Sequence, residues 1–140
     1  MDFHVTECFK HTDSRGYLVE FLRGSDMGDL GSPFGQIYFV TFERPFQVRG
    51  NHYHTRGTEW FGVAHGELEV ILEDVQTKER EKFILRSDDR SFTRLTVGAN
   101  VAHAFRNLSP TAVLLDYCTE EFDPRNLDRH PYLLLPPTME

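Results

Sequence analysis

The stretch that decides the fold is RGNHYHTRGTEWFGVAHG, residues 49–66. His52 and His54 are two positions apart, so on an extended strand both imidazole rings point to the same face. Glu59 follows the turn-prone residues 55–57, and we expect it to return on the neighbouring antiparallel strand and meet the two rings. Two imidazoles and a carboxylate that converge on one point form a ligand set that a divalent metal ion accepts.

A second short strand, residues 101–107, carries His103 as a fourth candidate ligand. The two segments together resemble the two sequence signatures of the cupin superfamily. The first signature corresponds to His52-x-His54, Glu59 and Gly66, and the second to His103 and Asn107. The resemblance implies an all-β fold, a double-stranded β-helix or jelly-roll barrel, in a single domain. Metal binding does not follow from the fold alone, because many cupins keep the barrel without an ion.

The turn before His103 differs from the superfamily pattern. It contains Gly98-Ala-Asn100 where the signature has Pro-x-Gly. Asparagine tolerates a left-handed backbone almost as well as glycine does. We therefore expect the turn to be kept.

The bulk composition limits the class of protein. A chain of 140 residues is long enough for one domain with its own core. The formal net charge of -7 argues against a nucleic-acid partner, because phosphate binding needs a basic face. Two cysteines are too few for a disulfide framework, and no apolar run is long enough to cross a membrane. These features favour a cytoplasmic protein that binds neither nucleic acid nor membrane.

Apolar and polar residues alternate along many short segments separated by polar turns, which is typical of a sandwich or barrel. We expect strands at 1–10, 16–22, 36–42, 48–54, 58–63, 67–75, 82–85, 91–97 and 112–118. Residues 11–16 have the composition of a turn and residues 24–34 that of an irregular loop. The single domain would consist of N-terminal strands in 1–24, the barrel in 36–118 and a proline-rich tail in 121–140. The Leu-Leu-Leu at 133–135 is expected to pack on the barrel or on a second subunit.

Further motifs resemble the sugar-nucleotide branch of the cupins. This branch includes dTDP-4-dehydrorhamnose 3,5-epimerases, dTDP-sugar 3,4-ketoisomerases and the C-terminal cupin of a bifunctional capsular-polysaccharide enzyme, to which the similarity is greatest. The motifs are Asp13-x-Arg15-Gly16, Phe34-Gly-Gln-Ile-Tyr38, Arg49-Gly-x-His52, Ala102-His103-Ala-Phe105 and Phe122-Asp-Pro124-x-Asn-x-Asp128.

The resemblance implies roles for individual residues. His52 matches the base of the epimerases, and together with His54 it matches paired histidines of the ketoisomerases. His103 matches a further active-site histidine, Arg49 a phosphate-binding arginine and Tyr38 a tyrosine of the ketoisomerase pocket. In an ideal strand Arg49 and His52 would face opposite ways, but Gly50 could host a bulge that redirects Arg49.

The chain departs from the epimerase pattern in the last barrel strand. The position of the epimerases' acid tyrosine falls on Asp116, and the neighbouring Tyr117 should face the other way. Either Tyr38 or Tyr117 could serve as the acid, while Asp116 and Gln36 could contact the substrate. A buried Asp116 would need a partner.

The resemblance implies an isomerase that acts on a nucleotide-activated 4-keto sugar by epimerisation or keto-isomerisation. We expect a homodimer and no organic cofactor. A divalent ion, zinc by preference, would be held by His52, His54, Glu59 and His103. The alternatives are a metal-dependent oxygenase or lyase that uses another small molecule, and a sugar-binding cupin without activity.

Overall fold

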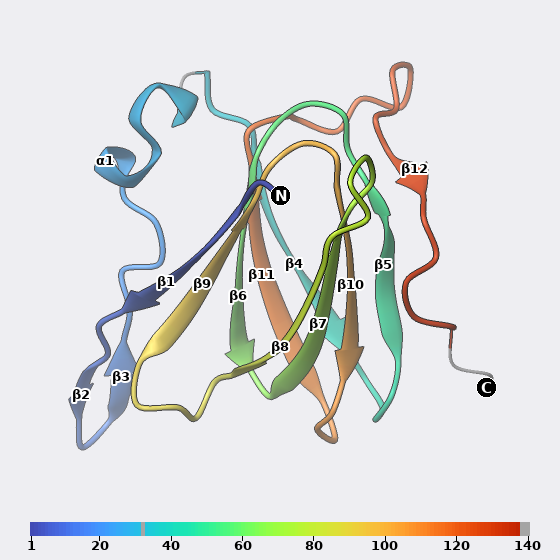
Figure 1. Ribbon diagram of the computed structural model, residues 1–140. Coiled ribbons are helices and arrows are strands. Elements are labelled where there is room, and N and C mark those ends of the chain that lie inside the picture. The colour runs from blue at the N-terminus through green and yellow to red at the C-terminus, as the bar shows by residue number, and fades with distance from the viewer. Residues whose placement is uncertain (32, 138–140) are drawn as a thin grey trace.

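The computed structural model describes residues 1–31 and 33–137, and it shows two antiparallel five-stranded sheets that close into a barrel (Figure 1). One sheet has the strand order β1-β9-β6-β11-β4 and the other β12-β5-β10-β7-β8. The strands of the first sheet are β1 (Phe3–Cys8), β9 (Phe92–Val97), β6 (Glu59–His65), β11 (Ala112–Cys118) and β4 (Gln36–Phe42). Those of the second are β12 (His130–Pro131), β5 (Val48–Tyr53), β10 (Val101–Asn107), β7 (Glu67–Asp74) and β8 (Arg80–Arg86).

The core lies between the two sheets. Alternate residues of each strand point inward, so that Phe61 of the first sheet packs in one buried cluster with Val70 and Phe105 of the second. The polar residues alternate outward on β7 and pair with cations, as Glu69 does with Arg106. The predicted all-β barrel is therefore confirmed, and the predicted bounds of β4 and β11 match the structure at both ends.

The N-terminal third differs from the prediction in two places. Residues predicted as a turn begin with a strand, β2 (His11–Asp13), which pairs with β3 (Gly16–Leu18) in a hairpin that projects from the barrel. The loop predicted after residue 24 contains a short helix, α1 (Gly24–Met27), followed by a 3-10 turn (Gly28–Gly31). Both elements are too short and too polar to produce a hydrophobic period.

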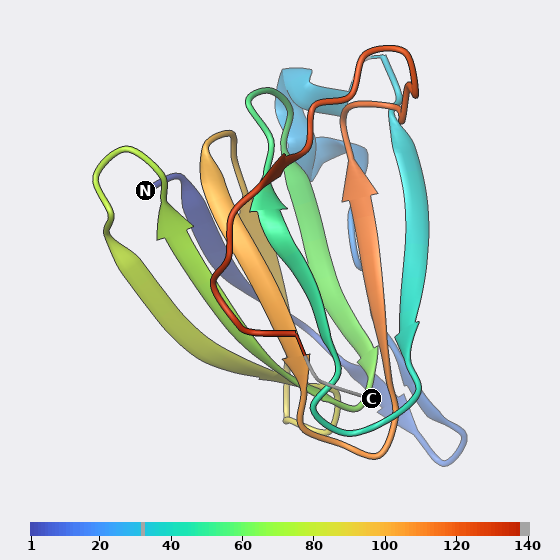
Figure 2. The ribbon, with the colours of Figure 1, turned by 90° about the vertical axis from the view of Figure 1, so that its right-hand side faces the viewer.

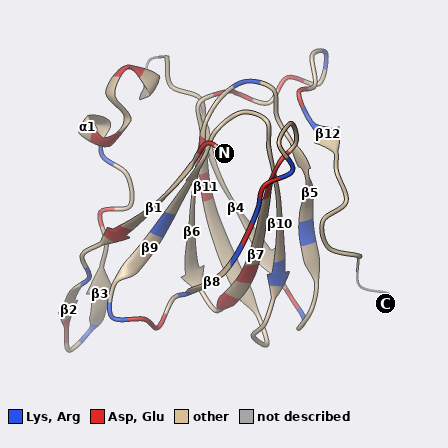
Figure 3. Ribbon diagram, viewed as in Figure 1, with Lys and Arg blue, Asp and Glu red and all other residues tan. Residues whose placement is uncertain are grey.

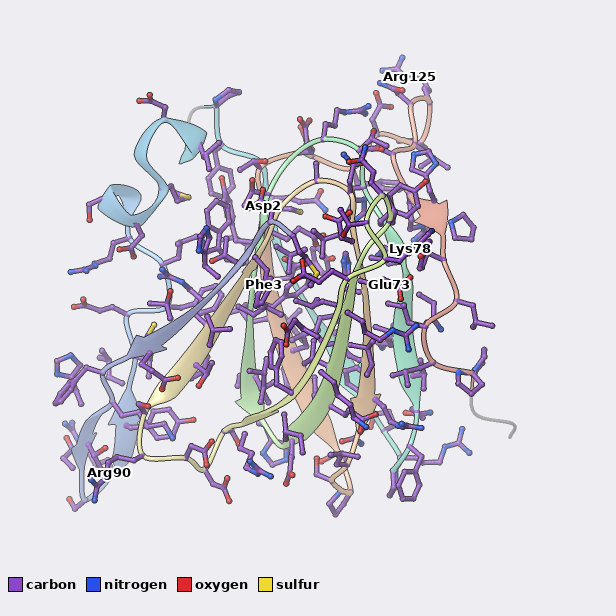
Figure 4. All side chains as sticks on the ribbon, viewed as in Figure 1. Asp2, Phe3, Glu73, Lys78, Arg90 and Arg125 are labelled. Carbon is purple, nitrogen blue, oxygen red and sulfur yellow. The ribbon has the colours of Figure 1, made fainter. Side chains whose placement is uncertain are left out.

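The C-terminal tail runs across the outer face of the second sheet, past β5 and β10 (Figure 2). Leu134 and Leu135 are buried there against Ile71 and two alanines of β10, whereas Leu133 is exposed. The tail is also held by Tyr132, whose hydroxyl donates to Glu73 of β7 and accepts from Lys78 in the β7–β8 hairpin. Glu73 and Lys78 are labelled in Figure 4. The prediction that the leucines pack on the barrel is confirmed for the last two.

Among the described residues, no helix has the length and apolar character needed to cross a membrane.

Candidate active site

A bulge in β5 brings Arg49 and His52 to the same side of the sheet. His103 of β10 lies opposite His52 and Phe105 lies opposite Arg49, so β5 spans the interval with one more residue than β10. Gly50 and Asn51 absorb the extra residue with φ angles of 97° and 59°. A Cβ at Gly50 would lie 2.7 Å from the carbonyl oxygen of His103, so only glycine fits. The bulge suggested by the sequence is confirmed.

Three histidines meet between the sheets. One ring nitrogen from each of His52, His54 and His103 lies within 4.8 Å of the others. The Nδ1 of each ring faces a backbone carbonyl oxygen: that of Gly50 at 3.1 Å, that of Asp128 at 2.5 Å and that of Val101 at 3.1 Å, respectively. A carbonyl can only accept, so each Nδ1 carries a proton and each Nε2 is left for the site.

Glu59 reaches the histidines from the opposite sheet. Its Oε1 lies 3.0 Å from Nε2 of His54 and 3.6 Å from Nε2 of His103. The carboxylate therefore meets the rings as the sequence predicted, but not from the neighbouring strand: β6 pairs with β9 and β11, while β5 pairs with β10 and β12. The 54–58 connection crosses between the sheets, which a local pattern of apolar residues does not reveal.

The cluster opens into a cavity of about 800 Å³ between the sheets, which continues to the β5–β6 turn and the tail. On the wall that faces the histidines, Tyr38 and Asp116 are opposite each other on β4 and β11. Asp116 is the only charged residue of β11, and it lines the cavity. Gln36 also lines the cavity, and its Oε1 accepts a hydrogen bond from the backbone N–H of Phe122 at 2.8 Å.

Tyr117 does not belong to the site. Its side chain is 2 % exposed and lies on the outer face of the sheet, against Trp60 and Phe34. Its hydroxyl accepts a hydrogen bond from the backbone N–H of Gly35 at 3.2 Å. The interpretation of Tyr117 as a possible acid is therefore wrong. Strand alternation explains why: since Asp116 faces the cavity, its neighbour must face away.

The environment separates the pKa values of the histidines. Burial, together with the charges of His103 and His54, lowers the pKa of His52 to about 4. Burial also lowers the pKa of His103. Burial alone would lower the pKa of His54, but the hydrogen bond to Glu59 and that carboxylate's charge outweigh it and raise the pKa. At neutral pH His52 is thus neutral. His54 holds a proton on both ring nitrogens more readily than an ordinary histidine does.

Two carboxyl groups, those of Glu59 and Asp116, lie next to the histidine cluster. Burial and the nearby charge of Glu59 raise the pKa of Asp116 well above its usual range. Burial would also raise the pKa of Glu59, but the hydrogen bond to His54 and the charge of His103 lower it. Both carboxyl oxygens of Asp116 are buried and have no hydrogen-bond partner within 3.5 Å among the described residues. Asp116 is therefore a polar group that faces the cavity without a fixed protein partner.

Arg49, the only charged residue of β5 (Figure 3), lies at the edge of the cavity. Its Nε donates to the carbonyl oxygen of Thr41 at 3.0 Å, and its guanidinium lies 5.6 Å from the centre of the Phe42 ring. These contacts hold Nε and one face of the guanidinium, and no described residue hydrogen-bonds to its two terminal nitrogens, which could bind an anion.

Sequence reasoning missed the part of the tail that forms one wall of the cavity. Residues 120–123 and 126–129 line it, next to the β5–β6 turn. The only available signal was the motif from Phe122 to Asp128, which supported the family resemblance but suggested no role for its residues. A polar, proline-containing segment has no periodicity from which its position could be predicted.

Fold and site together define a cupin-type barrel with a histidine-lined cavity. The chain belongs to a family described as the polysaccharide biosynthesis C-terminal domain, whose model matches residues 11–130. This family agrees with the resemblance to the C-terminal cupin of a capsular-polysaccharide enzyme. Among curated proteins, no sequence gives a significant match.

Solved structures with the same fold include enzymes of both types that the sequence resembled. A dTDP-4-dehydrorhamnose 3,5-epimerase from Bacillus anthracis has a TM-score of 0.78 and 21% identity, over 93% of this chain and 78% of that one. A 3'-monoepimerase from Streptomyces bikiniensis, in complex with dTDP-quinovose, has a TM-score of 0.77 and 21% identity, over 92% of this chain and 68% of that one. A 3,4-ketoisomerase from Helicobacter canadensis has a TM-score of 0.73 and 22% identity, over 92% of this chain and 90% of that one. These similarities confirm the predicted cupin barrel.

Proposed function

We propose that the protein is an isomerase that acts on a nucleotide-activated 4-keto sugar in polysaccharide or deoxysugar biosynthesis. The observation that carries the proposal is His52, a neutral histidine in a cavity of this fold. Its Nδ1 is fixed by the Gly50 carbonyl, and its pKa is lowered to about 4, so that Nε2 can accept a proton at neutral pH.

The reaction removes a proton beside the sugar carbonyl and forms an enolate, which is then protonated on carbon. His52 accepts the proton, and the charged form of His54 donates a hydrogen bond to the enolate oxygen. Return of the proton to the neighbouring carbon completes a keto-isomerisation. Return to the same carbon from the opposite side completes an epimerisation.

The facing wall favours epimerisation. Tyr38 and Asp116 lie on the first sheet, whereas His52 lies on the second, so a sugar between them has a base on one side and two acidic groups on the other. Burial and the charges of Asp116 and Glu59 raise the pKa of Tyr38, which keeps its phenol protonated. Either Tyr38 or the protonated Asp116 could therefore deliver the second proton.

The nucleotide part would be held at the edge of the cavity, with Arg49 as the anchor of the diphosphate. Solved relatives support a dTDP sugar as the first substrate to test, because one was obtained with dTDP-quinovose and a 3,4-ketoisomerase with TDP-4-keto-6-deoxyglucose. Gln36, which the tail holds in place through Phe122, would contact the sugar.

As an alternative to this metal-free mechanism, the histidine cluster fits a divalent ion, and we propose zinc as the first candidate; His52 would then be a ligand and not the base. Three Nε2 atoms face one another and the Glu59 carboxylate is adjacent, a set that suits zinc and leaves a position for substrate. Such an ion would act as a Lewis acid toward the substrate carbonyl. No organic cofactor is required by the proposed reaction.

The decisive experiment is incorporation of solvent deuterium into a dTDP-4-keto sugar, followed by NMR. The wild type should place deuterium on the carbon beside the carbonyl, and His52→Asn should lose this exchange. The matched control is His65→Asn, which changes an exposed histidine whose ring lies 3.2 Å from the Thr111 hydroxyl, outside the cavity. Binding of the sugar nucleotide without exchange in the wild type would indicate a sugar-binding cupin instead.

The metal proposal is tested separately by elemental analysis after zinc addition. His103→Ala should lose most of the zinc, because each lost ligand also frees the remaining ones, while circular dichroism still reports a folded barrel. Full zinc content in this variant, or none in the wild type, would contradict the metal site. The same ligands also suit iron, so oxygen consumption by the iron-loaded protein would favour the alternative of a metal-dependent oxygenase.

We also propose that the protein works as a homodimer in the cytoplasm. Leu134 and Leu135 pack on the outer face of their own barrel, but Ile37 and Phe39 on the outer face of β4 are 60% and 66% exposed. Exposed apolar side chains of this kind, on an edge strand, favour association. Light scattering after size-exclusion chromatography should give twice the mass of the chain, and a monomer at micromolar concentration would contradict the proposal.

A further inference from the structure

The three histidines of the site are oriented in two different ways. His52 and His103 donate from Nδ1 to carbonyl groups two residues earlier in their own strands, so the barrel itself fixes these acceptors. His54 lies just beyond the end of β5, and its acceptor is the carbonyl of Asp128, 74 residues further along the chain. The orientation of His54 therefore depends on how the tail is held.

The carboxylate of Asp128 holds the tail at this point. It accepts hydrogen bonds from the backbone N–H of Thr55 at 2.9 Å, from the Thr55 hydroxyl at 2.6 Å and from the backbone N–H of Arg56 at 2.9 Å. It also lies 3.1 Å from Nε2 of His130. These contacts saturate the acceptor sites of the carboxylate. The side chain of Asp128 is only 11% exposed.

The two groups of Asp128 act on consecutive residues. The carbonyl faces the ring of His54, and the carboxylate binds the next two residues, which begin the connection to Glu59. Arg56 adds a further link by donating to the carbonyl of Asn126 at 3.2 Å. The ring of His54 and the turn that follows are thus fixed by the same short piece of the tail.

We propose that Asp128 is the positioning residue of His54: its carboxylate fixes the 54–56 turn against the tail, and its carbonyl keeps the proton on Nδ1 so that Nε2 faces the site. A neutral ring whose single proton lies on Nε2 could not ligate an ion through that atom, whereas a ring held by the Asp128 carbonyl keeps Nδ1 protonated and turns Nε2 toward Glu59 and the site. This inference deepens the proposed function, since it assigns the group that orients one of its histidines. Its readouts use no substrate, so they stand apart from a failure of the isomerase assay.

The first test needs only the wild-type chain and uses NMR of ¹⁵N-labelled histidine. The His54 ring should show a proton on Nδ1 that exchanges with water more slowly than the ring protons of the exposed His4. If Nδ1 of His54 carries no proton, or if its proton exchanges as fast as those of His4, the proposal is wrong.

The second test compares Asp128→Ala with Asp74→Ala. Asp74 is a matched control because it is also mostly buried, at 15% exposure, and also accepts from two backbone N–H groups of a turn, those of Gln76 and Thr77. We expect Asp128→Ala to lose the slow Nδ1 proton and to weaken the binding of zinc alone by about 10–100-fold. Asp74→Ala should retain both properties.

Asp128→Asn provides the conservative comparison. Its amide oxygen can still accept from Thr55, but its NH₂ group must meet one of the remaining donors. It should therefore recover part of the zinc affinity and of the proton signal that alanine loses. The proposal is overturned if the alanine variant behaves as the wild type does, if asparagine is no better than alanine, or if Asp74→Ala causes an equal loss. Should Asp128→Ala fail to fold, the wild-type measurement still decides the question.

Discussion

Replacement of Asp116 by asparagine is expected to stabilise the fold. Among the described residues, neither of its buried carboxyl oxygens has a hydrogen-bond partner within 3.5 Å, and the carboxyl group of Glu59 lies nearby. An unsatisfied buried polar group costs about 1–3 kcal/mol. Asparagine has nearly the same shape and can donate an N–H to Glu59, so Asp116→Asn should raise the free energy of unfolding by about 1–3 kcal/mol at neutral pH.

The gain should depend on pH in a defined direction. The pKa of Asp116 is raised in the folded protein, so the folded state binds this proton more tightly than the unfolded state, whose aspartate has a pKa of about 3.9. As the pH rises above about 3.9, the wild type loses stability by up to about 1.4 kcal/mol per pH unit, until the folded carboxyl also ionises. The asparagine variant lacks this loss, so its advantage should be small near pH 4 and should then grow to a constant value.

Urea unfolding between pH 4.5 and 8, with a chelator present, measures both quantities. Asp88→Asn changes an exposed aspartate and controls for the removal of one negative charge. An asparagine variant no more stable than the wild type, or a gain that is the same at every pH, would refute the assignment of Asp116 as an unpaired buried acid. A gain in Asp88→Asn of equal size would attribute the effect to net charge instead.

Three further substitutions or conditions test other parts of the structure. Because the pKa of His52 is about 4, kcat/KM should fall as the pH drops through about 4, and a fall centred near 6.5 would show that another group is the base. Asn51→Ala should lower the free energy of unfolding by about 1–3 kcal/mol, since the side chain bonds two N–H groups and one carbonyl of the tail; unchanged urea unfolding would show that the tail is held by its leucines alone. Arg49→Gln should raise KM for the sugar nucleotide more than it lowers kcat, whereas the exposed Arg90→Gln (Figure 4) should change neither; equal KM values for all three proteins would exclude Arg49 as the anchor.

Much of the barrel could be predicted because alternation is a local property. The alternate positions of 36–42 and the apolar run of 112–118 placed β4 and β11 at their observed bounds. The same rule placed His52 and His54 on one face. Asn100 was expected to accept a left-handed backbone, and it does so with a φ of 64°. Each of these features depends only on residues close to one another in the chain.

The sequence could not decide which strands pair. Glu59 was expected beside the histidines on the neighbouring strand, yet β6 lies in the opposite sheet and Glu59 reaches them across the barrel. Pairing depends on which long-range contacts bury the most apolar surface and satisfy the backbone hydrogen bonds, and alternation is the same for every possible partner.

By itself, the sequence indicated the type of barrel, the shared face of His52 and His54, and that Asp116 and Tyr117 face opposite ways. The tertiary structure alone decided that Asp116 is buried with no hydrogen-bond partner among the described residues, that Tyr117 lies outside the cavity and that the carbonyl of Asp128 faces Nδ1 of His54. The physical reason is that the face of the sheet to which a side chain points follows from the geometry of its own strand. Its desolvation, its hydrogen-bond partners and therefore its pKa depend on segments that the closed barrel brings together from distant parts of the chain.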